Sequence, residues 1–266
     1  HFSTLLDDGS WLAELRPPGQ ATGPVTDGQP GERIRLPAGA VLVLQAQAGP
    51  RLWRVRAPVE GGLRAYLTAH GRPITYAYLR GSWPVQDYQT VFARDLGSAE
   101  MPSAGRPFST ALVTALVTAG VVVAPITLHT GVSSPEAGEP PLREWFRVPQ
   151  PTAELVALTG AAARRVIAVG TTVTRALESA ADPARPAGAG AGGVTATEGW
   201  TDLVLSAAQP ARVVDGIITG WHAPGASHLA LLTAVAGAAR VSEAYRAAVR
   251  DGYLWHEFGD SCLLLR

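Results

Sequence analysis

Along the first part of the chain, short apolar runs alternate with turn residues. The runs that predict strands are Trp11–Arg16, Glu32–Leu36, Ala40–Ala48 and Leu52–Ala57. The segments between these runs are rich in glycine, proline and aspartate, which end strands and form turns. Several short strands within so few residues predict a small β-barrel-like domain over residues 1–57.

From about residue 58, helical spacing of apolar positions alternates with short β-branched runs. Helices are predicted over Gly61–His70, Thr110–Ala119, Thr152–Arg164, Thr172–Ala181, His228–Ala236 and Val241–Arg250. Strands are predicted over Val121–Leu128, Val166–Val169, Asp202–Leu205 and Arg212–Val214. The alternation predicts an α/β fold, with the catalytic domain over residues 58–266. The segment Pro183–Gly193 is predicted to be a flexible surface loop.

One uncharged and mostly apolar run, Thr110–His129, approaches the length of a membrane span. Gly120 and Pro125 interrupt this run, and three valines follow the glycine. A buried helix, a glycine stop and a buried strand explain the pattern better than a membrane helix does. We therefore expect no membrane association.

Composition narrows the class of protein without identifying it. The chain has 22 basic and 22 acidic side chains, so no net charge draws it toward nucleic acid or membranes. Cys262 is the single cysteine, which excludes an internal disulfide and favours a reducing, cytoplasmic location. No histidine or cysteine spacing matches a zinc motif, so no metal is expected. Because the chain opens at His1 rather than methionine, we expect it to be a fragment.

The most informative local pattern is the run Val166–Val169, which enters Gly170 and then a helical pattern. A strand, a tight turn and a helix start are predicted there, with Thr171 or Thr172 capping the first turn. Free N–H groups at such a helix start bind anions such as a carboxylate or a phosphate. A purely structural turn, common in α/β proteins, is the alternative.

Two histidines lie where predicted strands end. His129 closes an apolar strand, and His222 follows a β-branched run and precedes Pro224. Ligands of open α/β sheets bind beyond the carboxyl ends of strands, so both are candidates for acid–base chemistry. The alternative for each is a core histidine with satisfied hydrogen bonds. Arg175 and Glu178 stand three residues apart on one helix, which predicts a surface ion pair.

Seven segments, taken in order, resemble the queuosine-biosynthesis family of S-adenosylmethionine:tRNA ribosyltransferase-isomerases. The segments are Tyr88–Ala93, Met101–Ser109, Leu128–Val132, Val169–Ser179, Thr201-Asp202, Val213–Pro224 and Phe258–Leu263. The resemblance covers almost the whole chain and keeps the family's order, which makes it specific. It implies an S-adenosylmethionine-dependent transferase and isomerase of tRNA modification.

The chain also departs from the family pattern. Pro107 and Leu142 stand where the family has histidines, and Gly220 stands where it has an asparagine. Ser133-Ser134-Pro135 replaces a family Gly-Thr-Phe, and the family's N-terminal segment is missing. We therefore expect a divergent, N-terminally truncated member, in which the identity of the acceptor is less secure than the family.

The resemblance implies a reaction in which S-adenosylmethionine donates its ribosyl group. The acceptor is 7-aminomethyl-7-deazaguanine at the wobble position of tRNA, and the products are epoxyqueuosine in tRNA, adenine and methionine. The reaction needs a base beside the sulfonium, a proton donor for adenine, and donors that hold the carboxylate and ribose.

The implied site residues divide by role. The catalytic candidates are His129, His222 and Asp202, and the sequence leaves open which of them is the base. The candidates for substrate binding are Tyr88, Gln89, Ser103, Gly105, Gly131, Gly170, Thr171, Thr172, Arg175 and Asp215. The helix start at Gly170 would hold an anionic group, with charge added by Arg175. Tyr88 is expected at the substrate entrance, where its ring stacks on a base.

Two other functions stay open at this point. One is an S-adenosylmethionine-cleaving enzyme with a non-tRNA acceptor, which the replaced histidines and the zero net charge motivate. The other is a non-catalytic RNA- or nucleoside-binding relative on the same fold. For the main reading we expect S-adenosylmethionine as co-substrate, tRNA as partner, no metal, and a monomeric cytoplasmic protein.

Overall fold

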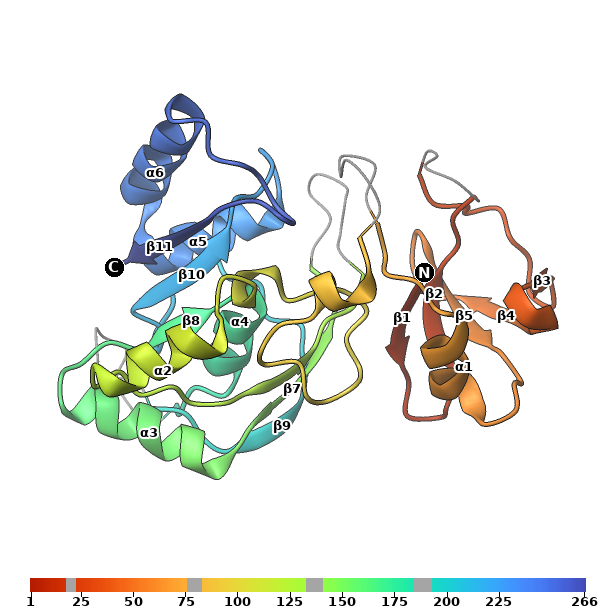
Figure 1. Cartoon of the computed structure of the whole chain (residues 1–266), viewed down its shortest axis with the longest axis horizontal. Helices are drawn as coiled ribbons and strands as arrows, with labels where there is room; N and C mark the ends of the chain where they lie inside the picture. The colour runs from red at the N-terminus through yellow and green to blue at the C-terminus, as the bar shows by residue number, and fades with distance from the viewer. Residues whose placement is uncertain (18–22, 76–82, 133–140, 184–192) are drawn as a thin grey trace. The chain divides into compact units, whose positions relative to one another are not determined.

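The computed structural model describes residues 1–17, 23–75, 83–132, 141–183 and 193–266 (Figure 1). The chain forms two compact units, each with its own core. The first comprises His1–Tyr88, Leu96–Glu100 and Thr130–Val132. The second comprises Gln89–Asp95, Met101–His129 and Ser133–Arg266. The predicted loop Pro183–Gly193 and the replacement Ser133-Ser134-Pro135 lie at least partly outside the described residues.

The first unit is built on a five-stranded antiparallel sheet with the order β1-β2-β5-β4-β3. Its strands are β1 (Phe2–Leu5), β2 (Trp11–Glu14), β3 (Arg33–Arg35), β4 (Val41–Gln47) and β5 (Leu52–Arg56). The inward side chains Leu44, Trp53 and Val55 form its core. Among the described residues, the outer strands β1 and β3 do not pair with each other, so the sheet is open. The β-barrel-like closure predicted for residues 1–57 is therefore not confirmed.

A helix belongs to this unit as well. α1 (Gly62–His70) buries Leu63, and its Tyr66 hydroxyl donates to Pro37 O at 2.9 Å. The change of pattern near residue 58 therefore does not coincide with the border of the first unit, which runs on to Tyr88.

The second unit is mixed α/β and holds two three-stranded sheets. One has the order β11-β10-β8, with β8 (Ile167–Val169) parallel to β10 (Gly216–Gly220) and β11 (Ser261–Leu265) antiparallel to β10. The other has the order β6-β7-β9 and is antiparallel, with β6 (Thr127–His129), β7 (Glu144–Val148) and β9 (Thr197–Thr201). The helices are α2 (Thr110–Thr118), α3 (Gln150–Ala161), α4 (Thr171–Ser179), α5 (Ser227–Ala236) and α6 (Ala238–Arg250).

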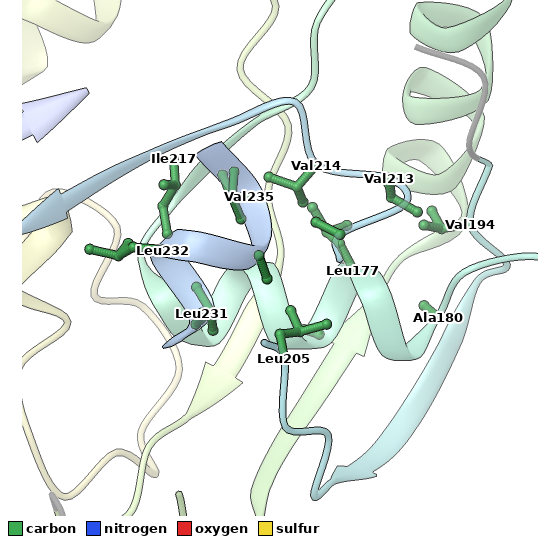
Figure 2. Close-up of a cluster of buried hydrophobic side chains, with 14 of the residues drawn as sticks. Leu177, Ala180, Val194, Leu205, Val213, Val214, Ile217, Leu231, Leu232 and Val235 are labelled. Atoms are coloured by element: carbon green, nitrogen blue, oxygen red, sulfur yellow. The ribbon is translucent and has the colours of Figure 1, made fainter. Parts of the chain in front are cut away.

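One hydrophobic core joins these elements. Figure 2 shows Leu177 of α4, Ile217 of β10 and Leu232 of α5 among its members. Ile217 and Leu232 have no solvent exposure. This core fixes α4 and α5 against β10, and so fixes the loops that follow β8 and β10.

The predicted helices of the second unit are all present, but several predicted strands are wrong. The strand predicted over Val121–Leu128 is confined to Thr127–His129, where β7 supplies a partner, and Val122 is 67% exposed. Arg212–Val214 is not a strand, because its three N–H groups donate to the Glu178 carboxylate. The strand predicted at Asp202–Leu205 ends instead at Thr201.

The charge-free run from Thr110 resolves into the predicted helix, α2, followed by a turn. Ser109 caps α2 by accepting the N–H of Leu112 at 3.1 Å. In the part of the chain that the structure describes, no helix is both long and apolar enough to cross a bilayer.

Candidate active site

Two parallel strands bring two of the predicted site segments to the same edge of a sheet. β8 leads into Gly170 and α4, whereas β10 leads into Trp221 and His222. Gly170 N–H donates to Ile218 O at 2.9 Å, which continues the pairing of β8 and β10. Because parallel strands share the edge where they end, the start of α4 and His222 lie on the same side of this sheet.

The start of α4 has no side-chain cap among the described residues. Gly170 precedes the first helical turn with φ 105° and ψ 155°, a conformation that is essentially restricted to glycine. The prediction that Thr171 or Thr172 caps the helix is wrong, because the Thr172 hydroxyl donates to Glu144 Oε1 at 3.1 Å instead. The first-turn N–H groups therefore face the sheet edge without a capping oxygen from this turn.

A short 3₁₀ helix, η3 (Ser103–Gly105), lies beside this helix start. A Cβ atom on Gly170 would stand 3.5 Å from Ala104 Cβ, and η3 also contacts β10. Ala104 and Gly105 are buried. The predicted site residues Ser103 and Gly105 therefore lie on a 3₁₀ helix beside Gly170, although more than sixty residues separate them from Gly170 in the sequence.

Arg175 is buried and bonded to protein groups. Its guanidinium donates to the Glu144 carboxylate, to Leu203 O at 2.9 Å and to Leu142 O at 3.1 Å. A further bond goes to Thr201 O at 3.2 Å. The predicted surface pair of Arg175 with Glu178 is therefore wrong, since Glu178 accepts backbone N–H groups of the segment before β10. Arg175 ties α4 to the ends of β7 and β9.

The second sheet contributes His129 at the edge that is bonded to α4. His129 ends β6 and stands opposite Trp145, while Glu144 begins β7 opposite Thr201, which ends β9. These ends lie together, and Glu144 bonds both Thr172 and Arg175 of α4. His129 stacks on Trp145 with ring centroids 4.9 Å apart. Asp202 follows Thr201 at the same edge and is exposed.

The ring of His222 stacks on that of His228, and the ring of His256 lies tilted beside them; we call these three residues the histidine stack. The His222 ring lies parallel to that of His228, with centroids 4.2 Å apart and an interplanar angle of 3°, and 5.4 Å from that of His256. His222 Nε2 is 3.0 Å from the Thr219 hydroxyl, and its backbone N–H donates to the Tyr245 hydroxyl at 3.1 Å. His222 is 9% exposed, so the strand-exit histidine is also a buried one.

Burial keeps these histidines neutral. It lowers the pKa of His222 well below 6.5, and the neighbouring imidazoles of His228 and His256 lower it further. Burial lowers the pKa of His228, with a smaller effect from the positive charge of Arg175. Burial also lowers the pKa of His256 to about 4. At neutral pH the stack is therefore uncharged, and the lowered pKa values make its imidazoles weaker bases than a free histidine.

The other predicted residues lie elsewhere. Asp215 lies just before the amino end of β10, where its carboxylate accepts the N–H of Val166 at 2.9 Å. This contact is at the edge of the sheet opposite to the one where His222 and the start of α4 lie. Tyr88 and Gly131 belong to the first unit, and Tyr88 is buried there. Gln89 belongs to the second unit and is exposed.

Several residues of this region escaped the sequence analysis as site residues. They are Glu144, Thr219, His228, Tyr245 and His256. His228 stands six residues after His222, just beyond the segment Val213–Pro224 that carries the family resemblance, so its spacing from His222 was the one available signal. Within the described ranges, no cluster of three histidine, cysteine or acidic side chains could hold a metal ion. The expected absence of a metal stays a prediction.

Comparison with known proteins decides the family. The family model described as "Queuosine biosynthesis protein" matches residues 3–264 of this chain. The chain belongs to this family. The resemblance found from seven short segments is thereby confirmed over nearly the entire sequence.

Relatives within the family carry a common name. A protein of Thermus thermophilus named "S-adenosylmethionine:tRNA ribosyltransferase-isomerase" is 36% identical over 97% of this chain and 74% of its own length. A protein of the same name from Paraburkholderia xenovorans is 40% identical over 90% of this chain and 69% of its own. A solved S-adenosylmethionine tRNA ribosyltransferase of Thermotoga maritima is 23% identical with a TM-score of 0.49, covering 90% of this chain and 67% of its own.

Proposed function

We propose that this chain transfers and isomerises the ribosyl group of S-adenosylmethionine onto a 7-aminomethyl-7-deazaguanine base of tRNA. The products are epoxyqueuosine in tRNA, adenine and methionine. The observation that carries the proposal is the 36% identity to the Thermus thermophilus enzyme over 97% of this chain. Similarity of that extent, together with a family match over residues 3–264, supports conservation of the reaction.

The uncharged histidine stack suits chemistry at a sulfonium. A protonated imidazole near the sulfur would repel the substrate's positive charge, whereas a neutral one does not. Burial keeps His222 neutral at pH 7, so its ring adds no positive charge beside the sulfonium. His222 is the candidate proton acceptor because it follows the carboxyl end of β10, where ligands of such sheets bind. His129, which ends β6 against Trp145, is the second candidate for contact with adenine or for proton transfer.

The uncapped start of α4 suits the anionic part of the substrate. Backbone N–H groups and the positive end of the helix dipole favour a carboxylate or a phosphate at this point. Thr171 and Thr172 supply the first-turn N–H groups, and Gly170 supplies the backbone geometry that exposes them. We propose that this turn holds the methionine carboxylate, while Arg175 keeps the turn in position through Glu144.

Release of adenine tests the proposal. The full chain is incubated with S-adenosylmethionine and precursor-bearing tRNA, and adenine is measured by chromatography. We expect turnover that requires tRNA and that His222→Ala lowers by about 100-fold or more, as for loss of an acid–base group. The matched control is His70→Ala, which removes an exposed histidine of α1 and should leave turnover unchanged. Unaltered turnover of His222→Ala would remove His222 from the reaction.

A different acceptor is the second candidate function. The zero net charge motivates it, because proteins that contact many phosphates usually carry a basic surface. Pro107 and Leu142, which stand in place of family histidines, also favour a different acceptor. Adenine released alongside chemically unchanged tRNA would favour this second reaction, and S-adenosylmethionine bound without adenine release would favour a non-catalytic relative.

A further inference from the structure

Three consecutive large side chains stand exposed in the loop between α6 and β11. Tyr253, Leu254 and Trp255 are 45%, 65% and 39% exposed, and Val249 in the last turn of α6 is 67% exposed. Single exposed apolar residues are ordinary on protein surfaces, whereas a contiguous group marks an interaction surface. We call residues Tyr253–Trp255 the aromatic loop.

The aromatic loop packs on the residues beneath it and is closed by hydrogen bonds. The ring of Tyr253 meets that of the buried Trp221 at 5.8 Å, and the ring of Trp255 meets that of Tyr245 at 5.8 Å. Leu254 and Asp260 close the loop, because Leu254 N–H donates to Asp260 Oδ2 at 2.7 Å and Asp260 N–H to Leu254 O at 2.9 Å. A surface held in one conformation loses little entropy when it binds a partner.

The aromatic loop adjoins the histidine stack. His256 follows Trp255 directly, and its N–H donates to Trp221 O at 3.1 Å, just beyond the carboxyl end of β10. The His256 ring lies 5.4 Å from that of His222. In Figure 1 the dark blue segment between α6 and β11 passes the end of β10 before it returns as β11. The exposed rings therefore border the candidate active site.

The helix before this loop is positively charged although the whole chain is neutral. α6 carries Arg240, Arg246 and Arg250 against a single acid, Glu243. Asp251 and Asp260 also lie nearby, but Arg250 pairs with Asp251 and Asp260 accepts the loop's own N–H. Arg246 is exposed and forms no ion pair within the described ranges, so its guanidinium is available for a phosphate.

We infer that the aromatic loop and the exposed side of α6 bind the single-stranded RNA next to the modified base. Tyr253 and Trp255 stack on bases of the opened loop, and Arg246 contacts a phosphate. Stacking rings beside arginines are how proteins hold unpaired RNA, since every base has a π-face and every nucleotide a phosphate. The inference rests on the proposed function, because it assigns the surface through which that reaction's tRNA is held.

Removal of each ring tests the inference. Tyr253→Ala and Trp255→Ala are compared with the unmodified chain for binding of precursor-bearing tRNA, by fluorescence anisotropy, and of S-adenosylmethionine, by calorimetry. Loss of one base–aromatic stack weakens RNA binding by about 5- to 150-fold. We expect that loss for each variant with S-adenosylmethionine affinity unchanged, and Tyr253→Phe should keep RNA affinity because it keeps the ring. Trp83→Ala, which removes an exposed tryptophan of the first unit, is the matched control.

The phosphate contact has its own signature. Arg246→Gln should weaken binding of all RNAs alike and reduce the dependence of log affinity on log salt by about one unit of slope. Unchanged RNA affinity in both alanine variants, with intact S-adenosylmethionine binding, would overturn the inference and leave the proposed reaction standing. Loss of thermal stability or of S-adenosylmethionine binding in both alanine variants would also overturn it, by assigning the rings to packing against protein. A chain that releases adenine but never binds tRNA would overturn both proposals.

Discussion

Removing the Arg175 side chain tests whether this buried arginine organises the candidate active site. Arg175 is 5% exposed and its partner Glu144 is 13% exposed. In Arg175→Ala, Glu144 loses its ion-pair partner, and the carbonyl groups of Leu142 and Leu203 lose their donors. Breaking a buried pair by removing one partner costs about 3–5 kcal/mol, because the other charge stays buried.

That magnitude is large against the stability of a typical domain, about 5–15 kcal/mol. For a unit of this size we expect the melting temperature to fall by about 6–20 °C. The assay is thermal and urea unfolding of the full chain followed by tryptophan fluorescence. Arg147→Ala is the matched control, since Arg147 pairs with Asp95 at the surface, where a pair contributes about 0–1 kcal/mol. A loss in Arg175→Ala no larger than in Arg147→Ala would refute the assignment of Arg175 to positioning.

Three further predictions concern single side chains near the site. Gly170→Ala should cost about 1–3 kcal/mol in unfolding free energy and weaken S-adenosylmethionine binding in calorimetry, because alanine rarely adopts φ 105°. An unchanged affinity would contradict this. The pKa of His256 is lowered from 6.5 to about 4, so the unfolded state binds its proton more tightly. Unfolding free energy should therefore fall by about 1.4 kcal/mol per pH unit as pH drops from 6.5 to about 4. His256→Asn should flatten that slope in urea titrations, whereas His70→Asn should not. Cys262 is half-buried, and burial raises the pKa of its thiol to about 11, so iodoacetamide at pH 8 should alkylate it more slowly in the folded chain than in the unfolded chain. Equal labelling rates in the two states would contradict this prediction.

Local patterns predicted the elements whose signal lies within their own residues. The helical spacing of Thr172–Ala181 and the β-branched run before Gly170 correspond to α4 and β8. The resemblance of seven ordered segments predicted the family, because those segments were matched as short motifs that need no knowledge of the fold.

The conformations and burial that the sequence did not predict depend on contacts between segments distant in the chain. Arg212–Val214 has the β-branched character of a strand, yet Glu178, from another helix, takes up its N–H groups. The helical spacing of Arg175 and Glu178 likewise predicted a surface pair, although Arg175 is buried and donates to the carbonyl groups of Leu142 and Leu203, which are distant in sequence. The stacking of His222 with His228 and His256 also needs a loop from the end of the chain.

Mass analysis of the wobble nucleoside tests the central claim most directly. Precursor-bearing tRNA is incubated with the full chain and S-adenosylmethionine and then digested to nucleosides. The mass of the modified nucleoside is measured by mass spectrometry, and free adenine is quantified in the same reaction. We predict conversion of the 7-aminomethyl-7-deazaguanine nucleoside to epoxyqueuosine, with one adenine released for each nucleoside converted. An unchanged nucleoside mass, with or without adenine release, would contradict it.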